Sequence, residues 1–340
     1  MHMADALLSP AVGGIMAAAT VAALGCSLKK MSADNAIDEK KIPLMGIMGA
    51  FVFAAQMINF TIPGTGSSGH IGGGIRLAAI LGPYPALVTM AVILLIQALF
   101  FADGGLLALG CNIFNMGVCA CMFGYASIFR PMTKSGLSPR RITAASILSI
   151  VLGLQLGAFC VVLETTASGV TELPFRTFLL LMQPIHLAIG LVEGLVTAAV
   201  LCFIYGTRPE ILECTAADKK MDGDLSVRRV LGTFAVLTLL TGCGLSIFAS
   251  SFPDGLEWSM EKVAGTAELV RSGSVYRMMK EVVSATAFMP DYAFSSEGEA
   301  GANVGTATAG LVGSAIVLAI TCAIGAAISA LRRRSSTTAR

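Results

Sequence analysis

The residues with the clearest potential for chemistry stand at the start of the chain, MHMADALLSP. A free amine at Met1, the peptide nitrogen between Met1 and His2, and the His2 imidazole can close around one metal ion in five- and six-membered chelate rings. Once the peptide nitrogen loses its proton, these donors are nearly coplanar. Planar nitrogen sites suit Ni²⁺ or Cu²⁺, whereas zinc prefers a tetrahedron and magnesium or calcium prefer oxygen. No basic residue precedes Lys29, as a cleaved signal segment would require, so we expect Met1 to be retained with a free amine.

A fourth nitrogen could come from His70, in the stretch IPGTGSSGHIGGG at residues 62–74. This stretch is too rich in glycine for a stable helix interior, so we expect a loop there. The chain has three histidines, and His186 is the third. The residues alone leave two interpretations open. Either Met1, His2 and His70 form a four-nitrogen metal site, or His2 is an interfacial residue and His70 is a loop residue that is hydrogen-bonded to its own backbone.

The composition indicates what kind of chain must position these donors. Of 340 residues, 55% are hydrophobic and only 13% are charged, and the mean hydropathy is +0.78. A soluble domain carries about a quarter charged residues, so we predict an all-α, polytopic membrane bundle. The formal net charge of +2 argues against nucleic-acid binding. The nine cysteines lie mostly inside apolar runs, which favours packing over metal binding.

Apolar runs of about 20 residues predict membrane-spanning helices. Seven fall in a first domain of residues 1–206, and two more form a hairpin in residues 229–340. A polar linker, residues 207–228, joins the two parts. The predicted spans are 7–28, 42–62, 72–83, 85–102, 105–128, 142–163, 182–205, 230–250 and 305–331, of which the third is short and rich in glycine.

Lysine and arginine concentrate in four segments that flank these spans, and such segments face the cytoplasm. Placing all four on one side puts the carboxyl terminus in the cytoplasm and the amino terminus outside. The loops 63–71, 164–181 and 251–304 would then also lie outside, so His2 and His70 share one side of the membrane. The basic residues are Lys29, Lys30, Lys40, Lys41, Arg130, Lys134, Arg140, Arg141, Arg208, Lys219, Lys220, Arg228, Arg229, Arg332, Arg333, Arg334 and Arg340.

The sequence resembles the CbiM/NikM family, the substrate-capture subunits of energy-coupling-factor transporters for cobalt and nickel. Besides the start of the chain, the stretches that carry the resemblance are FVFAAQMINFTIPGTGSSGHIGGG (51–74), FFADGGLLALGCNIFNMG (100–117) and HLAIGLVEGLVTA (186–198). The stretch SSFPDGLEW at 250–258 is similar to the PDGLE-type partner subunit (NikN/CbiN-like), here fused to the first domain.

The resemblance implies the substrate-binding subunit of an ATP-driven importer in the cell membrane, with Ni²⁺ or Co²⁺ as substrate and no prosthetic group. Its partners would be a transmembrane coupling subunit (CbiQ/NikQ-like) and cytoplasmic ATPase subunits (CbiO/NikO-like). The chain itself would not be an enzyme, and its sequence contains no G-x-x-x-x-G-K-[ST] loop. In nickel members, the positions equivalent to Met1, His2 and His70 hold the metal. Residues 3–6 depart from the usual start, and Ala6 stands where the family often has glycine.

Several polar residues have both a functional and a structural interpretation. They could hydrogen-bond the ligands or the His70 loop and so orient the site, or they could simply bond neighbouring helices. This group comprises Gln56, Asn59, Ser68 and Asn112, with Asn115 open to the same two readings. Asp103, at a helix end, is interpreted as a turn or cap.

Two further groups lie inside the predicted spans. His186 and Glu193 share one face of the seventh span, and ionisable residues in a membrane are functional candidates. The resemblance makes neither a ligand, so structural bonding or a role in an interface is favoured. Gly14, Ala18 and Ala22 recur every four residues in the first span and permit close helix approach. Their partner is either a coupling subunit, as in related capture subunits, or a helix of the same bundle.

The 251–304 segment is acidic, with Asp254 and Glu257 among its carboxylates, and would attract cations weakly. We assign it no ligands. A self-sufficient secondary transporter or channel is the main alternative function, but few charges lie at the middle of the predicted spans. A metal-dependent membrane hydrolase would need an open coordination position and a base. The planar site and the PDGLE-type part favour nickel over cobalt.

Overall fold

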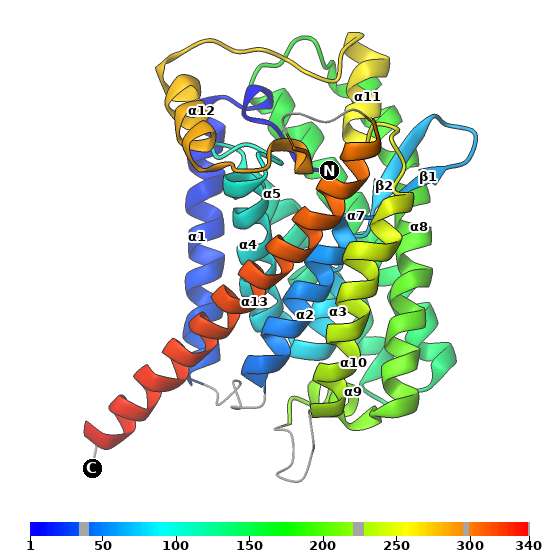
Figure 1. Ribbon diagram of the computed structural model, residues 1–340, viewed down its shortest axis with the longest axis vertical. Helices are drawn as coiled ribbons and strands as arrows, with labels where there is room; N and C mark the ends of the chain where they lie inside the picture. Colours follow the sequence, from blue (N-terminus) through cyan, green and yellow to red (C-terminus); the bar gives the residue numbers. More distant parts are fainter. Residues whose placement is uncertain (34–40, 220–227, 295–298, 339–340) are drawn as a thin grey trace.

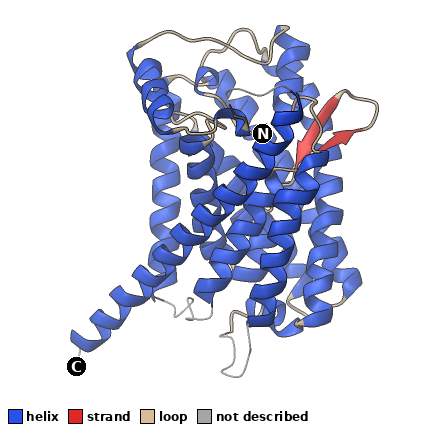
Figure 2. Cartoon of the chain, in the orientation of Figure 1, coloured by secondary structure: helices blue, strands red, loops and turns tan. Residues whose placement is uncertain are grey.

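The protein is a bundle of long, tilted helices with one small sheet at one end (Figures 1 and 2). The computed structural model describes residues 1–33, 41–219, 228–294 and 299–338. Seven helices in this part are long and apolar enough to cross a membrane. The prediction of an all-helical, multi-pass membrane bundle is therefore confirmed. These helices are Pro10–Ser32, Pro83–Phe100, Leu109–Thr133, Pro139–Ala167, Phe175–Thr207, Arg228–Phe248 and Val304–Leu331.

Two of the predicted spans are wrong in extent. Helix α2 (Lys41–Gln56) has 16 residues and ends before a strand, so the range 42–62 is not one helix. Helix α3 (Gly74–Leu81) has only 8 residues where 72–83 was predicted, and all of them are buried. A helix of this length is about 12 Å long, against a hydrocarbon core of about 30 Å. Non-helical backbone is tolerated beside α3 because it is buried in protein.

Strands β1 (Asn59–Ile62) and β2 (Ser67–His70) form an antiparallel hairpin. The sequence predicted the end of a membrane span at β1 and a loop at β2. Gly64 and Gly66 have φ of +77° and +74° in the connecting turn, a conformation that glycine adopts without strain. The hairpin stands beside α8 (Phe175–Thr207) at the upper right of Figure 1. Its second strand places His70 at the point where the chain re-enters the bundle.

The remaining elements of residues 1–219 follow in chain order. Around the amino terminus lie η1 (Asp5–Leu7) and α1 (Pro10–Ala33). After α3 come α4 (Pro83–Phe100), α5 (Leu109–Asn112), η2 (Ile113–Phe129, wound as a π-helix), α6 (Arg130–Thr133), α7 (Pro139–Ala167), α8 and α9 (Pro209–Ala216).

The second part of the chain contributes one interrupted span, two short helices and one long helix. The span consists of α10 (Arg228–Leu239), η3 (Leu240–Gly244) and η4 (Leu245–Phe248). Between it and the last helix, α13 (Glu299–Thr338), lie α11 (Gly255–Ala264), α12 (Ser274–Thr286) and η5 (Pro290–Tyr292).

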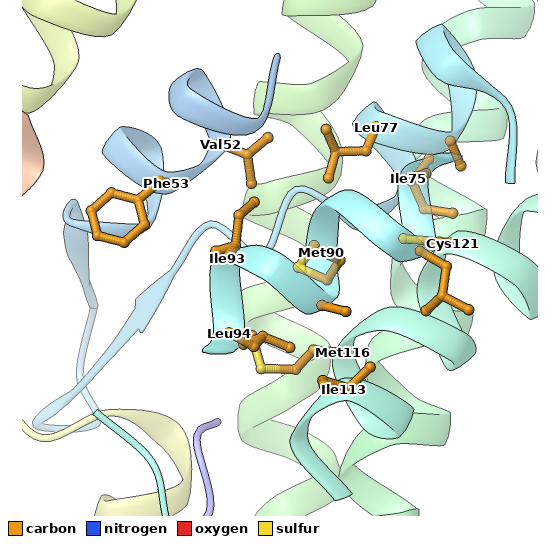
Figure 3. Close-up of a cluster of buried hydrophobic side chains, with 14 of the residues drawn as sticks. Val52, Phe53, Ile75, Leu77, Met90, Ile93, Leu94, Ile113, Met116 and Cys121 are labelled. Atoms are coloured by element: carbon orange, nitrogen blue, oxygen red, sulfur yellow. The ribbon is translucent and has the colours of Figure 1, made fainter. Parts of the chain in front are cut away.

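The core lies where α2, α3, α4 and η2 meet (Figure 3). Val52 and Phe53 come from α2, Leu77 from α3, Ile93 from α4 and Cys121 from η2, and all are buried. Small residues let the helices approach closely, as expected for packing in lipid. A Cβ added to Gly110 would lie 2.5 Å from the backbone nitrogen of Ala17.

The second part of the chain is packed onto the first. Ser314 of α13 donates to the Ala50 carbonyl of α2 at 3.0 Å. At the upper end of Figure 1, the Tyr276 hydroxyl of α12 donates to the Leu8 carbonyl at 2.7 Å. The segment from α11 to η5 therefore covers the end of the bundle that carries the amino terminus and the hairpin, which we call the histidine end.

The described basic segments lie at the opposite end, which we call the basic end (Figure 1). There the Arg130 guanidinium forms an ion pair with Asp218, and the Tyr205 hydroxyl donates to the Leu137 carbonyl at 3.1 Å. The ends of α1 and α13 point the same way. Lys40, Lys220 and Arg340 lie outside the described residues.

Candidate metal centre

The amino-terminal segment is held inside the histidine end by a pair of backbone contacts. The Asn112 side chain accepts from the Met3 amide at 2.8 Å and donates to the Met3 carbonyl at 3.1 Å. The same carbonyl accepts from the Gly105 amide at 2.9 Å. Met1 and Met3 are buried. Asn112 thus fixes the backbone next to the proposed donors.

The His2 imidazole contacts two polar side chains from α4 and the turn after it. Its Nε2 lies 3.2 Å from Gln97 Oε1, and its Nδ1 lies 3.3 Å from Asp103 Oδ1. Gln97 also donates to Gln56 Oε1 at 2.9 Å, and Gln56 donates to the Gly72 carbonyl at 2.9 Å. This chain of amides links His2 to the backbone that follows His70.

The two histidines lie side by side. The ring centroids of His2 and His70 are 5.1 Å apart, and the ring planes differ by 16°. Asn59 is paired with His70 in the hairpin, and its carbonyl accepts from the Ser250 amide at 2.7 Å. Ser68 holds β2 to the second part of the chain, because its amide and its hydroxyl donate to the Pro253 and Phe252 carbonyls, both at 2.8 Å.

The Met1 amine forms an ion pair with the Asp254 carboxylate. Asp254 begins α11 in a capping box, with its Oδ1 accepting from the Leu256 and Glu257 amides and the Glu257 carboxylate accepting from the Asp254 amide. The turn is therefore rigid, and it presents the other carboxylate oxygen to the amine. An amino-terminal ammonium and an α11 carboxylate meet although they are 253 positions apart in the sequence.

The electrostatic environment keeps the imidazoles in the form that binds metal. Burial lowers the pKa of His2, and burial together with the positive Met1 amine lowers the pKa of His70 well below its usual value. Neutral imidazole is the metal-binding form. Burial alone would raise the pKa of Asp254, but its ion pair with the Met1 ammonium outweighs this effect and brings the pKa below the usual range.

Two cavities meet at these residues. A cavity of about 340 Å³ lies toward the second part of the chain and is lined by His2, His70, Asp103, Asp254 and further residues. A smaller cavity of about 40 Å³ lies inside the bundle. Its wall includes Met1, His70, Asn115, His186 and Glu193. His70 and Asp254 line both cavities, so the cluster separates an outer chamber from an inner one.

Some predicted residues lie elsewhere, and some neighbours of the cluster were not foreseen. Gly14, Ala18 and Ala22 are exposed on α1, and nothing lies within 4 Å of a Cβ built on Gly14. The residues that sequence reasoning missed are Gln97, Asp103 as a His2 contact, and Asp254 as the Met1 partner. The only signal for Asp254 was its place in SSFPDGLEW.

The fold and the cluster together define a polytopic membrane protein that gathers an amine and two imidazoles at one end of a helical bundle. Residues 2–211 match the family described as "Cobalt uptake substrate-specific transmembrane region", and residues 228–330 match the PDGLE domain. The chain belongs to this cobalt-uptake family and carries a PDGLE domain in addition. It is a multi-pass membrane protein of a family of nickel and cobalt transport proteins.

Relatives of similar length support this assignment. The chain is 31% identical over 320 residues to the putative fused nickel transport protein NikMN of Archaeoglobus fulgidus, covering 94% of this chain and 96% of the relative. It is also 31% identical to the fused nickel transport protein NikMN of Rhodobacter capsulatus, covering 98% and 100%. A crystal structure of a transition metal transporter matches with a TM-score of 0.54 at 32% identity, over 63% of this chain and 96% of that one.

Proposed function

We propose that this protein is the metal-binding membrane subunit of an ATP-driven, energy-coupling-factor importer that captures Ni²⁺ or Co²⁺ outside the cell. The proposal is supported by membership of the cobalt-uptake family and by the fused nickel-transport relatives. The observation that carries it is the stacking of His2 and His70, 5.1 Å apart, beside the buried Met1 amine.

In the proposed site, the ion is held by the Met1 amine, the Met1–His2 peptide nitrogen, His2 Nδ1 and His70. The five- and six-membered rings of this chelate require Nδ1 of His2 rather than Nε2. In the structure, Nδ1 faces Asp103 and the amine is paired with Asp254. Metal binding must therefore exchange both contacts, releasing one proton from the ammonium and one from the peptide nitrogen. The two carboxylates remain nearby as negative charges beside the bound ion.

The ion is a transported substrate in this proposal, so the protein must release it toward the cytoplasm. The sequence has no nucleotide-binding loop of the P-loop pattern, and ATP hydrolysis is assigned to separate ATPase subunits. The exposed face of α1 that carries Gly14, Ala18 and Ala22 is proposed as the contact for the transmembrane coupling subunit. The histidine end faces outward and the basic end faces the cytoplasm, following the distribution of lysine and arginine.

Nickel is favoured over cobalt because planar nitrogen coordination suits Ni²⁺ and because affinity for nitrogen ligands rises from cobalt to nickel. Competing Cu²⁺ binds such sites still more tightly. Which of these ions is bound therefore depends on their concentrations outside the cell. The binding experiment should titrate Ni²⁺, Co²⁺ and Cu²⁺.

The test is metal binding to the purified protein with a tag at the carboxyl end only. We expect one tightly bound Ni²⁺ with the optical spectrum of a planar, diamagnetic complex. His2→Ala, His70→Ala and a form with extra residues before Met1 should each lose that spectrum. The carboxyl-terminal tag is the matched control for the amino-terminal extension. An unchanged planar spectrum in the extended form would remove the amino-terminal chelate from the proposal.

A further inference from the structure

The inner cavity, beneath the proposed capture site, is lined by groups that attract a cation. Its outer wall includes Met1 and His70, and its lining continues inward along α8 past His186 to Glu193. These two residues are seven positions apart on one helix face, about 10 Å along the axis. An ion that leaves the capture site inward therefore enters this cavity directly.

Asn115 supplies an unpaired acceptor to the cavity. This residue is 2% exposed and belongs to the wall of the cavity. Nδ2 donates to Glu164 Oε2 at 2.8 Å, while Oδ1 has no hydrogen-bond partner among the described residues. A buried carbonyl oxygen without a partner is costly unless something occupies the space before it. Water or a cation can satisfy it, and a volume of about 40 Å³ has room for either.

His186 presents its second nitrogen in the same place. The side chain is 1% exposed, and its Nδ1 donates to the Met182 carbonyl at 2.8 Å. In the neutral imidazole, Nε2 is then the atom that carries the lone pair. Metal-binding histidines commonly donate their other nitrogen to a carbonyl in this way, which fixes the ring.

Glu193 closes the inner part of the cavity and is tied to the His70 loop. Its Oε1 accepts from the Gly73 amide at 2.7 Å, three residues after His70. Further inward, the buried Arg76 guanidinium donates to Thr197 Oγ1 at 3.3 Å, one turn beyond Glu193 on α8. Glu193 and Arg76 also attract one another, so the carboxylate draws a cation inward without binding it tightly.

We propose that this cavity is a second, transient binding site for the transported divalent cation. His186 Nε2, Asn115 Oδ1 and the Glu193 carboxylate would hold the ion in this cavity, with water bridging the ion to those groups that it does not contact directly. This inference rests on the proposed function and extends it to a step between capture and release. The site offers mixed nitrogen and oxygen donors without planar geometry, so it binds the ion more weakly than the capture site does. A weaker inner site lets the ion leave the chelate without being trapped again.

The experiment uses the full chain with extra residues before Met1, so that the amino-terminal chelate cannot form. Co²⁺ is the probe, because imidazole and carboxylate ligands suit it and its visible bands report coordination geometry. We expect one weakly bound Co²⁺ with a non-planar spectrum. Glu193→Gln should weaken this binding about tenfold or more, while keeping an acceptor for the Gly73 amide. His186→Asn should weaken it similarly, because it keeps a donor for Met182 but removes Nε2.

The matched control is Asp291→Asn, which removes a carboxylate from the wall of the outer chamber only. It should leave the weak Co²⁺ affinity unchanged. The inner site would be overturned if the extended protein bound no Co²⁺, or if Glu193→Gln and His186→Asn bound Co²⁺ as tightly as the extended protein without these substitutions. Loss in Asp291→Asn would place the ion in the outer chamber and overturn it as well. A planar Ni²⁺ spectrum that survives the extension would instead count against the capture proposal, so the two failures are distinguishable.

Discussion

At the scale of single residues, two of the proposed donors, the Met1 amine and the His2 imidazole, are each held by a carboxylate. Asp254 pairs with the Met1 amine, and Asp103 contacts His2 Nδ1 at 3.3 Å. Asp103 is itself held by the Tyr292 hydroxyl at 2.5 Å. A bound divalent ion would replace protons at the amine and the peptide nitrogen, so both carboxylates would come to stand beside a positive complex. Carboxylates in such positions orient ligands and raise metal affinity.

The substitution Asp254→Asn tests the negative charge of the Asp254 carboxylate separately from its role as a helix cap. Asparagine is as good a helix cap as aspartate, so α11 should begin at the same place. Without the negative charge, the amine is no longer anchored and the bound ion loses a neighbouring anion. We expect the Ni²⁺ affinity to fall about tenfold or more, measured by competition with a chelator of known strength. Unchanged affinity would show that Asp254 holds the Met1 amine only in the metal-free protein and does not strengthen metal binding.

At the scale of elements, the hairpin positions His70 by close packing rather than by many hydrogen bonds. A Cβ built on Gly69 would lie 2.7 Å from Ile189 Cγ1 of α8, closer than real carbon atoms approach. The hairpin therefore lies flat against α8 only because residue 69 has no side chain.

Gly69→Ala should push the hairpin away from α8 and move His70 relative to His2. We expect Ni²⁺ affinity to fall about tenfold, as happens when the support of a ligand is disturbed. The double variant Gly69→Ala with Ile189→Ala restores the space and should recover most of the affinity. Failure of the second substitution to rescue the first would mean that the packing does not position His70.

The turn between α4 and α5 positions the amino-terminal segment in a similar way. A Cβ on Gly105 would lie 1.8 Å from Asp5 Oδ1, and the Gly105 amide donates to Met3. Gly105→Ala should displace the amino terminus and abolish the planar Ni²⁺ spectrum while the bundle still forms. Gly25→Ala on α1, where nothing lies within 4 Å of the added Cβ, should have no effect on that spectrum. Equal spectra in the two variants would contradict this role of the turn.

At the scale of the whole molecule, the two parts of the chain enclose the cluster between them. The first domain supplies the nitrogen donors, and the second supplies Asp254 and much of the wall of the outer chamber. The described basic segments lie at the far end of the bundle (Figure 1). This arrangement agrees with a transport route for the metal ion that begins in the outer chamber and ends at the basic end.

The proposed orientation predicts which bonds a protease can reach. Arg271 lies between α11 and α12 at the histidine end, next to the 93% exposed Val270. Trypsin added to intact cells or right-side-out vesicles should cut there. Arg140 and Arg141, at the start of α7 at the basic end, should be cut only after the membrane is opened. Mass spectrometry of the fragments gives the result, and the reverse pattern would invert the orientation.

The sequence predicted much of the fold because long apolar runs have few alternatives in lipid. The closeness of His2 and His70 could also be anticipated, since both fell on one side of the predicted spans. The hairpin could not, because NFTI alternates over only four residues and continues an apolar run, while SSGH contains no apolar residue. The length of helix α3 was predicted wrongly because a helix of eight residues is stabilised by burial rather than by its own sequence. Asp254 meets Met1 through tertiary structure, which no local pattern records.

The backbone contact between Ser68 and Pro253 has a consequence for how the site assembles. A hydrogen bond of this kind contributes only about 1 kcal/mol net, which adds little to binding between separate proteins. Joined in one chain, the two partners meet at an effective concentration on the order of millimolar, whatever the abundance of the protein in the membrane. The fused arrangement therefore fixes the stoichiometry of the two parts at one to one. It also makes closure of the chamber over the histidines independent of how many copies the cell makes.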